Sequence, residues 1–466
     1  MLISTSRVML CVVVGVGLWA REPSVASQPD SVSIVVPQAP VLVDQRVRIR
    51  LRGLKPKQEV TLHFQESLNG GEWTSQAKFR ANAKGIIDIA TVPALSGTYK
   101  GVDAMGLFWS ATKAKGQRSP YWIPWAKPKA TWPVVFTARV DGKQVASATL
   151  LRRWVAPNVN VSWVKERGLY GRFFEPKAAK KRPAVLIFGG SGGGLTMQTR
   201  ASLFAAHGYP TLAVAYFKAK GLPKQLSEIP LEYFEKAFRF LDAQPSVDGE
   251  RLIVCGASRG GELALLLGST YAKRIRGVVA YVPSSVLWRG YPDSTKSAWT
   301  LRGKPLPSMR SENLKNKDRY QKNMAKYSKD KTISTTPWWH AMLAEKELVR
   351  HAAIPVERTQ GVVLLISGKK DATWPSTRMS EMVMKRLKSN KFEYQAMHLA
   401  YDQTGHMISP PYRPTRQYTR SWRGKTIGTS KGHARAFEDS WRKTLQLLEK
   451  HVPWEETPQS KNPPQH

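Results

Sequence analysis

The chain has 466 residues, of which 42% are hydrophobic and 23% are charged, so it can bury a sizeable core in two or three domains and is not a disordered protein. Lysine and arginine outnumber aspartate and glutamate by 72 to 34, and the formal net charge is +38. Such a charge attracts polyanions, anionic membranes or phosphorylated substrates. However, the basic residues are scattered, and the sequence has no zinc-ligand spacing, RNA-binding signature or DNA-binding helix pair. We therefore expect a solvated basic surface and no specific nucleic-acid partner.

Residues 1–26 have the pattern of an export signal. Arg7 precedes the apolar run VMLCVVVGVGLW (Val8–Trp19), which is too short to span a bilayer, and Ser24-Val25-Ala26 suits a signal peptidase. We therefore expect an exported protein, periplasmic or secreted, with no transmembrane span after cleavage; an uncleaved membrane anchor is the alternative. Removal of the signal leaves Cys255 as the remaining cysteine, which excludes an internal disulfide but does not identify the compartment.

Residues 27–155 have the pattern of an all-β domain. VRIRLRG (Val47–Gly53) alternates apolar and basic residues, and the run from Val134 to Trp154 is divided by the turn Asp141-Gly142. Short strands separated by turn residues predict a β-sandwich.

From residue 156 to 455 continuous apolar runs alternate with helical patterns. Alternation of this kind predicts a doubly wound, mostly parallel sheet; the expected strands are Ala184–Phe188, Thr211–Tyr216, Leu252–Gly256, Gly277–Val282, Val362–Gly368 and Phe392–His398, and the expected helices are Leu226–Ala243, Gly260–Thr270 and Arg378–Ser389. Residues 288–361 interrupt the pattern with a basic, tryptophan-containing stretch that we interpret as a lid. Residues 456–466 read as a disordered tail.

The stretch Gly256-Ala257-Ser258-Arg259-Gly260 fits the G-x-S-x-G nucleophile elbow, in which glycines flank a serine held on a sharp strand-to-helix turn. The pentapeptide alone is a weak signal. Its context strengthens it, because an apolar strand precedes it and a leucine-rich helix follows. Ser258 is therefore the candidate nucleophile.

A glycine-rich loop, GGSGGGL (Gly189–Leu195), follows an earlier predicted strand. Backbone N–H groups of Gly190, Ser191 and Gly192 could approach a developing oxyanion together with the N–H of Arg259. A flexible turn or a phosphate loop is the alternative, although the loop lacks the Lys-Ser/Thr ending of a P-loop.

Asp371 lies just after the predicted strand Val362–Gly368, and His406 lies in a short loop after a later strand, 35 residues further on. The order Ser258, Asp371, His406 is that of α/β-hydrolases, and the spacing allows one helix and one strand between two neighbouring loops. We therefore predict a Ser-His-Asp triad that needs no metal and no cofactor. His207 is expected to end a helix and His398 to lie in a strand, while His340 could contact substrate from the lid.

Long segments of the chain resemble the acyl-CoA thioesterase and bile acid-CoA:amino acid N-acyltransferase family across almost all of the mature sequence. The segments are Leu95–Ser110 (LSGTYKGVDAMGLFWS), Gly189–Phe217, Gly256–Ser269 (GASRGGELALLLGS), Ala298–Pro307, Ile354–Ser376, Gly405–Tyr412 (GHMISPPY) and Gly432–Leu448. The resemblance implies an N-terminal immunoglobulin-like β-sandwich, an α/β-hydrolase domain, and a Ser/Cys-His-Asp triad that falls on Ser258, His406 and Asp371. Where family members often have two acids in succession, this chain has Lys370-Asp371.

The resemblance implies hydrolysis of acyl-CoA by a serine thioesterase, and the basic surface would suit the phosphates of CoA. Three alternatives stay open. Transfer of the acyl group to an amino acid is associated in this family with cysteine as nucleophile. An exported esterase or peptidase would use the same triad on another acyl ester or thioester, and a non-catalytic polyanion-binding protein would use the charge alone.

Overall fold

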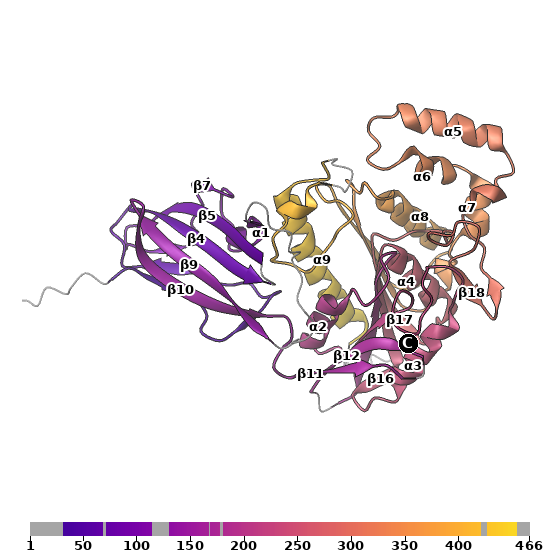
Figure 1. Ribbon diagram of the computed structural model, residues 1–466, viewed down its shortest axis with the longest axis horizontal. Helices are drawn as coiled ribbons and strands as arrows, with labels where there is room; N and C mark the ends of the chain where they lie inside the picture. Colours follow the sequence, from indigo (N-terminus) through magenta and orange to yellow (C-terminus); the bar gives the residue numbers. More distant parts are fainter. Residues whose placement is uncertain are drawn as a thin grey trace, which may run out of the picture.

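The computed structural model describes residues 31–68, 71–113, 130–166, 168–177, 180–420 and 426–453. The predictions of an export signal at residues 1–26 and of a disordered tail at residues 456–466 lie outside these ranges. Figure 1 shows a β-domain at one end of the molecule and an α/β-domain at the other. No helix in the described ranges combines the length and the hydropathy needed to cross a membrane.

The β-domain consists of two sheets that share one core. One sheet has the antiparallel order β1 (Ser33–Val35), β3 (Arg50–Arg52), β6 (Ile87–Asp88). The other has the order β2 (Val41–Leu42), β10 (Lys143–Arg153), β9 (Thr131–Val140), β4 (Glu59–Leu68), β5 (Gly71–Arg80), β7 (Ser96–Gly97), with β8 (Thr112–Lys113) also on β5. Buried and more exposed residues alternate along β5, as expected for a strand that covers a core on one face. The immunoglobulin-like assignment stays a prediction.

The α/β-domain is built on an eight-stranded sheet. Its order is β11 (Val159–Val164), β12 (Tyr170–Pro176), β14 (Thr211–Ala215), β13 (Arg182–Phe188), β16 (Val247–Ala257), β17 (Ile275–Tyr281), β20 (Val362–Gly368), β21 (Ala396–Tyr401). From β14 to β21 all neighbours are parallel, which confirms the predicted mostly parallel sheet. The last strand begins at Ala396, so the prediction was wrong for Phe392–Gln395.

Helices cover both faces of this sheet. On one face α2 (Gln198–Ala206) and α9 (Ser430–His451) pack against strand residues such as Ile187 and Ile253, and the same hydrophobic cluster continues into the β-domain. On the other face α3 (Glu232–Asp242), α4 (Arg259–Thr270) and α8 (Ser376–Ser389) pack against the alternate strand residues Leu186 and Val254. Residues 226–231, predicted as helix, instead contain the short strand β15 (Ile229–Pro230).

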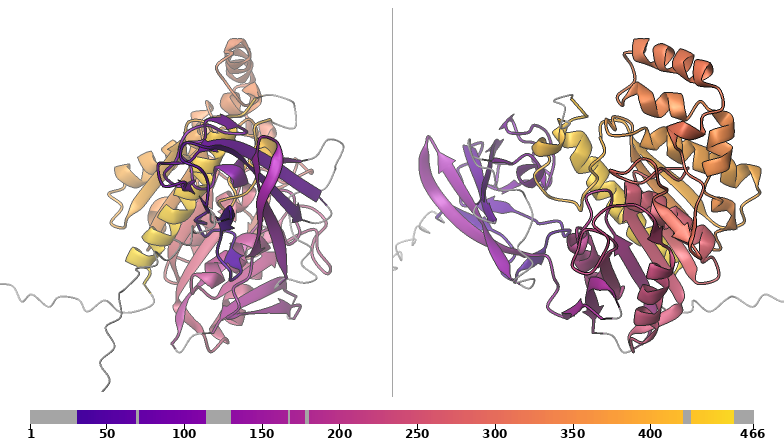
Figure 2. Two further views of the ribbon diagram at one scale, coloured as in Figure 1. Left: turned by 90° about the vertical axis from the view of Figure 1, so that its left-hand side faces the viewer. Right: turned by 45° about the vertical axis from the view of Figure 1, so that its right-hand side comes forward.

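The chain between β17 and β20 forms a substructure of its own. β18 (Trp299–Leu301) and β19 (Lys304–Pro305) join β15 in a small sheet. The helices α5 (Lys317–Lys329), α6 (Pro337–Met342) and α7 (Lys346–Ala352) follow, and α5 and α6 extend beyond the main sheet (Figure 2). Short connections complete the described elements: α1 (Gly106–Trp109) in the β-domain and the 3-10 turns Ser311–Asn313, Val356–Arg358 and Arg416–Tyr418.

Candidate active site

Ser258 occupies a strained turn between β16 and α4. Its φ is 59° and its ψ is −121°, a conformation that residues with a Cβ rarely adopt. The flanking glycines are required by space: a Cβ on Gly256 would lie 2.0 Å from the carbonyl oxygen of Gly260, and a Cβ on Gly260 would lie 2.4 Å from that of Gly189. The local backbone therefore has the geometry predicted for a nucleophile elbow.

Asp371 and His406 lie together at the carboxyl ends of neighbouring strands. β20 and β21 are parallel, with Gly368 opposite Tyr401, so the loops that follow them emerge at the same edge. His406 Nδ1 lies 2.8 Å from Asp371 Oδ2. The buried carboxyl of Asp371 also accepts hydrogen bonds from Ser376 Oγ at 2.6 Å and from the backbone N–H of Thr373 at 2.9 Å. These contacts fix the carboxyl group that orients the imidazole.

Ser258 lies at the same edge of the sheet, because β16, β17 and β20 are parallel neighbours. The N–H of Ser258 donates to the carbonyl of Tyr281 at the end of β17, at 2.9 Å. Within the described ranges no hydrogen bond joins Ser258 Oγ to His406. The structure thus pairs two of the three predicted residues and places the third at the end of β16, which β17 separates from β20.

The glycine-rich loop contacts the elbow at one position. A Cβ on Gly190 would lie 3.0 Å from Ser258 Cβ and 3.5 Å from the backbone nitrogen of Arg259. Gly192, in contrast, faces open space, and Ser191 lies between the two. Gly190 therefore lies directly beside Ser258 and the Arg259 N–H, whereas Gly192 does not.

The side chains of Arg259 and Glu262 form a buried polar network that the sequence reasoning missed. Arg259 donates to the carbonyls of Trp288 at 3.0 Å and Arg289 at 3.1 Å, and pairs with Glu262 at 3.2 Å. Glu262 also accepts from Trp299 Nε1 at 2.8 Å. Burial raises the pKa of Glu262 to about 7.

This network attaches the start of α4 to the substructure between β17 and β20. A glutamate at position 262, in an otherwise apolar helix, was the signal available in the sequence, because a buried acid requires a partner.

Tryptophans form a continuous contact from His406 into the same substructure. The ring of Trp374 lies 6.1 Å from the His406 ring, Trp339 lies 5.8 Å from Trp374, and Trp288 lies 4.7 Å from Trp339. Trp374 and Trp288 are buried, whereas Trp339 is half-buried. The side of the site next to His406 is therefore aromatic and apolar.

Two family models match the chain. "BAAT / Acyl-CoA thioester hydrolase C terminal" matches residues 229–453, and "Acyl-CoA thioester hydrolase/BAAT N-terminal region" matches residues 44–166. Mouse acyl-coenzyme A thioesterase 1 is 30% identical over 425 residues, which cover 88% of this chain and 94% of the mouse protein. The chain belongs to the acyl-CoA thioester hydrolase/BAAT family.

Another family relative is mouse mitochondrial acyl-coenzyme A thioesterase 2, 30% identical over 450 residues, covering 93% of this chain and 91% of that protein. Among solved structures, an alpha/beta hydrolase from a deep-sea metagenome library covers 63% of this chain and 100% of its own, with 16% identity and a TM-score of 0.39. A dienelactone hydrolase-like promiscuous phosphotriesterase covers 63% and 98%, with 17% identity and a TM-score of 0.37. The family resemblance read from the sequence is thus confirmed by the sequence relatives.

The structure also places the other histidines and the cysteine that the sequence analysis considered. His207 caps the end of α2 and His398 lies in β21, as predicted. Cys255 is buried in β16, and burial raises the pKa of its thiol to about 12, so it is not a nucleophile near neutral pH. His340 lies in α6, and burial together with Arg378 lowers its pKa to about 4. No group of metal-ligating side chains occurs among the described residues.

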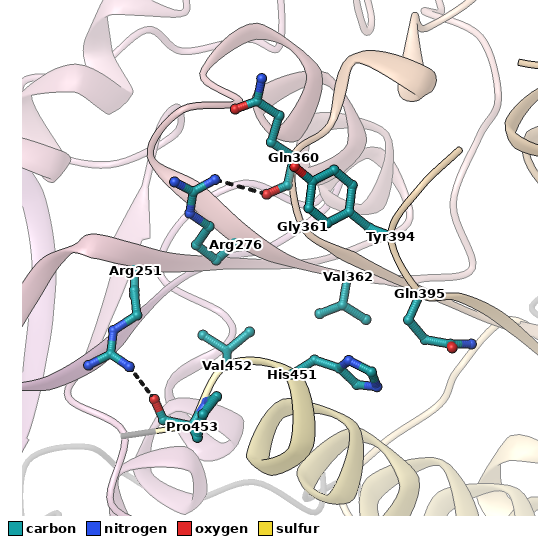
Figure 3. Close-up of a pocket in the computed structure, with 10 residues that line it drawn as sticks. All are labelled: Arg251, Arg276, Gln360, Gly361, Val362, Tyr394, Gln395, His451, Val452 and Pro453. Atoms are coloured by element: carbon teal, nitrogen blue, oxygen red, sulfur yellow. Dashed lines mark hydrogen bonds between the residues drawn. The ribbon is translucent and has the colours of Figure 1, made fainter. Parts of the chain in front are cut away.

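Figure 3 shows a cavity of about 310 Å³ whose lining does not include Ser258. Its lining includes Arg276 near the start of β17, Val362 at the start of β20, and Gln395 just before β21. It therefore lies at the amino ends of the strands, whereas ligands of open α/β sheets bind at the carboxyl ends.

Proposed function

We propose that the protein hydrolyses acyl-CoA to a free acid and CoA, with Ser258 as nucleophile, His406 as general base and Asp371 as the group that orients the imidazole. The observation that carries the proposal is the Asp371–His406 pair at 2.8 Å, at the sheet edge where Ser258 occupies a strained elbow. Membership of a family whose models are named for acyl-CoA thioester hydrolases supports a thioester as substrate.

In the first half of the reaction His406 Nε2 removes the proton from Ser258 Oγ as the oxygen attacks the thioester carbon. The N–H groups of Arg259 and of the loop at Gly190 would stabilise the negative oxygen of the tetrahedral intermediate, as Gly190 lies beside both Ser258 and the Arg259 nitrogen. The C–S bond then breaks, and His406 delivers its proton to the sulfur of CoA.

In the second half water replaces CoA. His406 takes a proton from water, the oxygen attacks the acyl-serine ester, and the proton passes to Ser258 Oγ as the acid leaves. Transfer to an amino acid would need the acceptor amine to outcompete water. Serine at position 258, where cysteine is associated with transfer, supports hydrolysis.

The export signal predicted at residues 1–26 favours a second candidate, because an exported enzyme would meet other acyl esters or thioesters. The same triad chemistry applies to them. We also propose that residues 1–26 are an export signal and that the β-domain is immunoglobulin-like.

The test replaces Ser258 by alanine and measures free CoA released from a series of acyl-CoA substrates and nitrophenyl esters. We expect a loss of about 10³-fold or more in kcat/KM, no labelling by a fluorophosphonate probe, and unchanged turnover in the control Ser389→Ala, an exposed position at the end of α8. Activity retained by Ser258→Ala would refute the triad, and a preference for nitrophenyl esters would favour the second candidate. Product mass spectra with glycine or taurine present would reveal transfer.

A further inference from the structure

The segment that follows His406 is irregular and buried. Residues 407–415 have no helix or strand, yet Ile408 and residues 410–415 are buried between the β-domain and the α/β-domain. Buried backbone without regular structure needs hydrogen-bond partners from elsewhere. The identity of these partners therefore decides how the loop that carries His406 is held.

Two buried arginines from different domains hold the segment. Arg200 in α2 donates to the carbonyl of Ile408 at 2.8 Å. Arg152, at the end of β10 in the β-domain, donates to the carbonyl of Tyr412 at 3.0 Å. The β-domain also accepts from the segment, since the carbonyl of Trp109 receives the N–H of Thr415 at 3.0 Å.

Arg152 is itself held rigidly. Its guanidinium pairs with Glu66 at 3.0 Å, donates to the carbonyl of Val43 at 2.9 Å, and lies 4.9 Å from the ring centre of Phe108. Its side chain is 1% exposed. A planar guanidinium with several fixed acceptors serves as a stiff connector, which a lysine ammonium cannot reproduce.

Tyr412, whose carbonyl accepts from Arg152, has an unusual backbone conformation. Tyr412 has a φ of 56°, a left-handed conformation that is unfavourable for a residue with a Cβ. Its carbonyl is fixed by Arg152, and its hydroxyl donates to Glu438 in α9 at 2.9 Å. Strained residues persist where surrounding contacts determine them, and such positions occur at functional sites.

We propose that Arg152 is a positioning residue for His406, so that the β-domain is part of the catalytic apparatus. The inference rests on the proposed function. Tyr412 lies six residues after His406, and its restraint by Arg152 limits the conformations of the loop that presents the imidazole to Asp371 and Ser258. A misplacement of about 1 Å in a catalytic group can cost about 10²-fold in rate.

The test replaces Arg152 by methionine together with Glu66→Gln, so that no unpaired buried acid remains. The matched control is Asp44→Ala. Asp44 also makes contacts from the β-domain to the α/β-domain, partly buried ones with His207 at 2.6 Å and Trp441 at 2.9 Å, but none with residues 407–415. Arg152→Lys, with Glu66 intact, is the conservative variant if the double variant does not fold.

We expect the Arg152 variants to lose about tenfold or more in kcat with little change in KM, Arg152→Lys being intermediate, and the Asp44→Ala control to stay within about twofold of the parent. Hydrogen exchange of the peptide covering residues 407–415 should accelerate in the Arg152 variants alone. Fluorophosphonate labelling of Ser258 should slow in parallel with kcat.

Equal losses of kcat in the Arg152 variants and the control, or parental kcat in the Arg152 variants, would overturn the inference. Failure of the proposed function gives a different result, because the parent protein itself would then show neither turnover nor labelling.

Discussion

The β-domain contacts the segment that follows His406, and the substructure between β17 and β20 contacts Arg259, next to Ser258, but the two are attached in different ways. The β-domain shares a continuous hydrophobic cluster with α2 and α9. Part of the substructure, including Trp288 and Met342, packs in a small separate cluster, whereas Ala298 and Trp299 belong to the large cluster on the main sheet. Its outer helix α5 has no buried residue. Elements with few buried contacts open at lower free energy than the rest of a fold.

Different parts of the molecule hold the two sides of the site. The His406 side depends on extensive packing and on Arg152, whereas the Ser258 side depends on the contacts of Arg259 and Glu262 with the substructure. We therefore expect the outer helices α5 and α6, which extend beyond the main sheet (Figure 2), to be the part that moves when substrate enters, and the β-domain to be the fixed part.

The largest effect is expected from Arg259→Met. The substitution removes the two contacts with the carbonyls of Trp288 and Arg289 and leaves Glu262 buried without its charged partner. We expect a loss of about 3–5 kcal/mol in the free energy of unfolding, measured in urea. The control Lys296→Met breaks the exposed pair with Glu228 and should cost far less than Arg259→Met, because water screens that pair. Similar losses in both variants would show that Arg259 does not anchor the substructure.

An intermediate effect concerns pH. The folded-state pKa of Glu262 is raised to about 7 by burial, so the folded protein holds a proton that the unfolded chain releases near pH 4.5. As pH rises from about 4.5 to about 7, the parent should lose about 1–3 kcal/mol of unfolding free energy relative to Glu262→Gln. Denaturant titrations of both proteins at several pH values measure this difference. If the difference in unfolding free energy between the parent and Glu262→Gln did not change with pH, the raised pKa of Glu262 would be contradicted.

The smallest effect is expected from Trp339→Leu. Trp339 is half-buried between Trp288 and Trp374 on the side next to His406, so its loss removes aromatic contact area without changing the groups that react. We expect KM for acyl-CoA to rise about fivefold, equivalent to about 1 kcal/mol, with kcat nearly unchanged. Trp163→Leu, at an exposed position in β11, is the control. A fall in kcat with constant KM would place Trp339 in the chemistry and not in binding.

Much of the α/β-domain could be read from local patterns. The apolar runs predicted strands because strands covered on both faces need no polar residues, and the elbow glycines were informative because a Cβ at Gly256 or Gly260 would collide with backbone. The boundaries were less accurate. The predicted helix began at Leu226, but the helix in the structure begins at Glu232. The residues before it include the strand Ile229–Pro230, which pairs with β18, about 70 positions later in the chain. A local pattern does not record such a distant partner.

The sequence by itself determined the order of strands and helices, the strained serine turn, and the placement of Asp371 and His406 after successive strands, because these depend on short-range periodicity and turn chemistry. Only the tertiary structure decided that Arg152 contacts Tyr412, 260 residues away, and that Arg259 contacts the carbonyls of Trp288 and Arg289. An arginine side chain has the same local sequence signature on a solvated surface as in an interior. Its partners are chosen by the packing of whole domains, which no local pattern records.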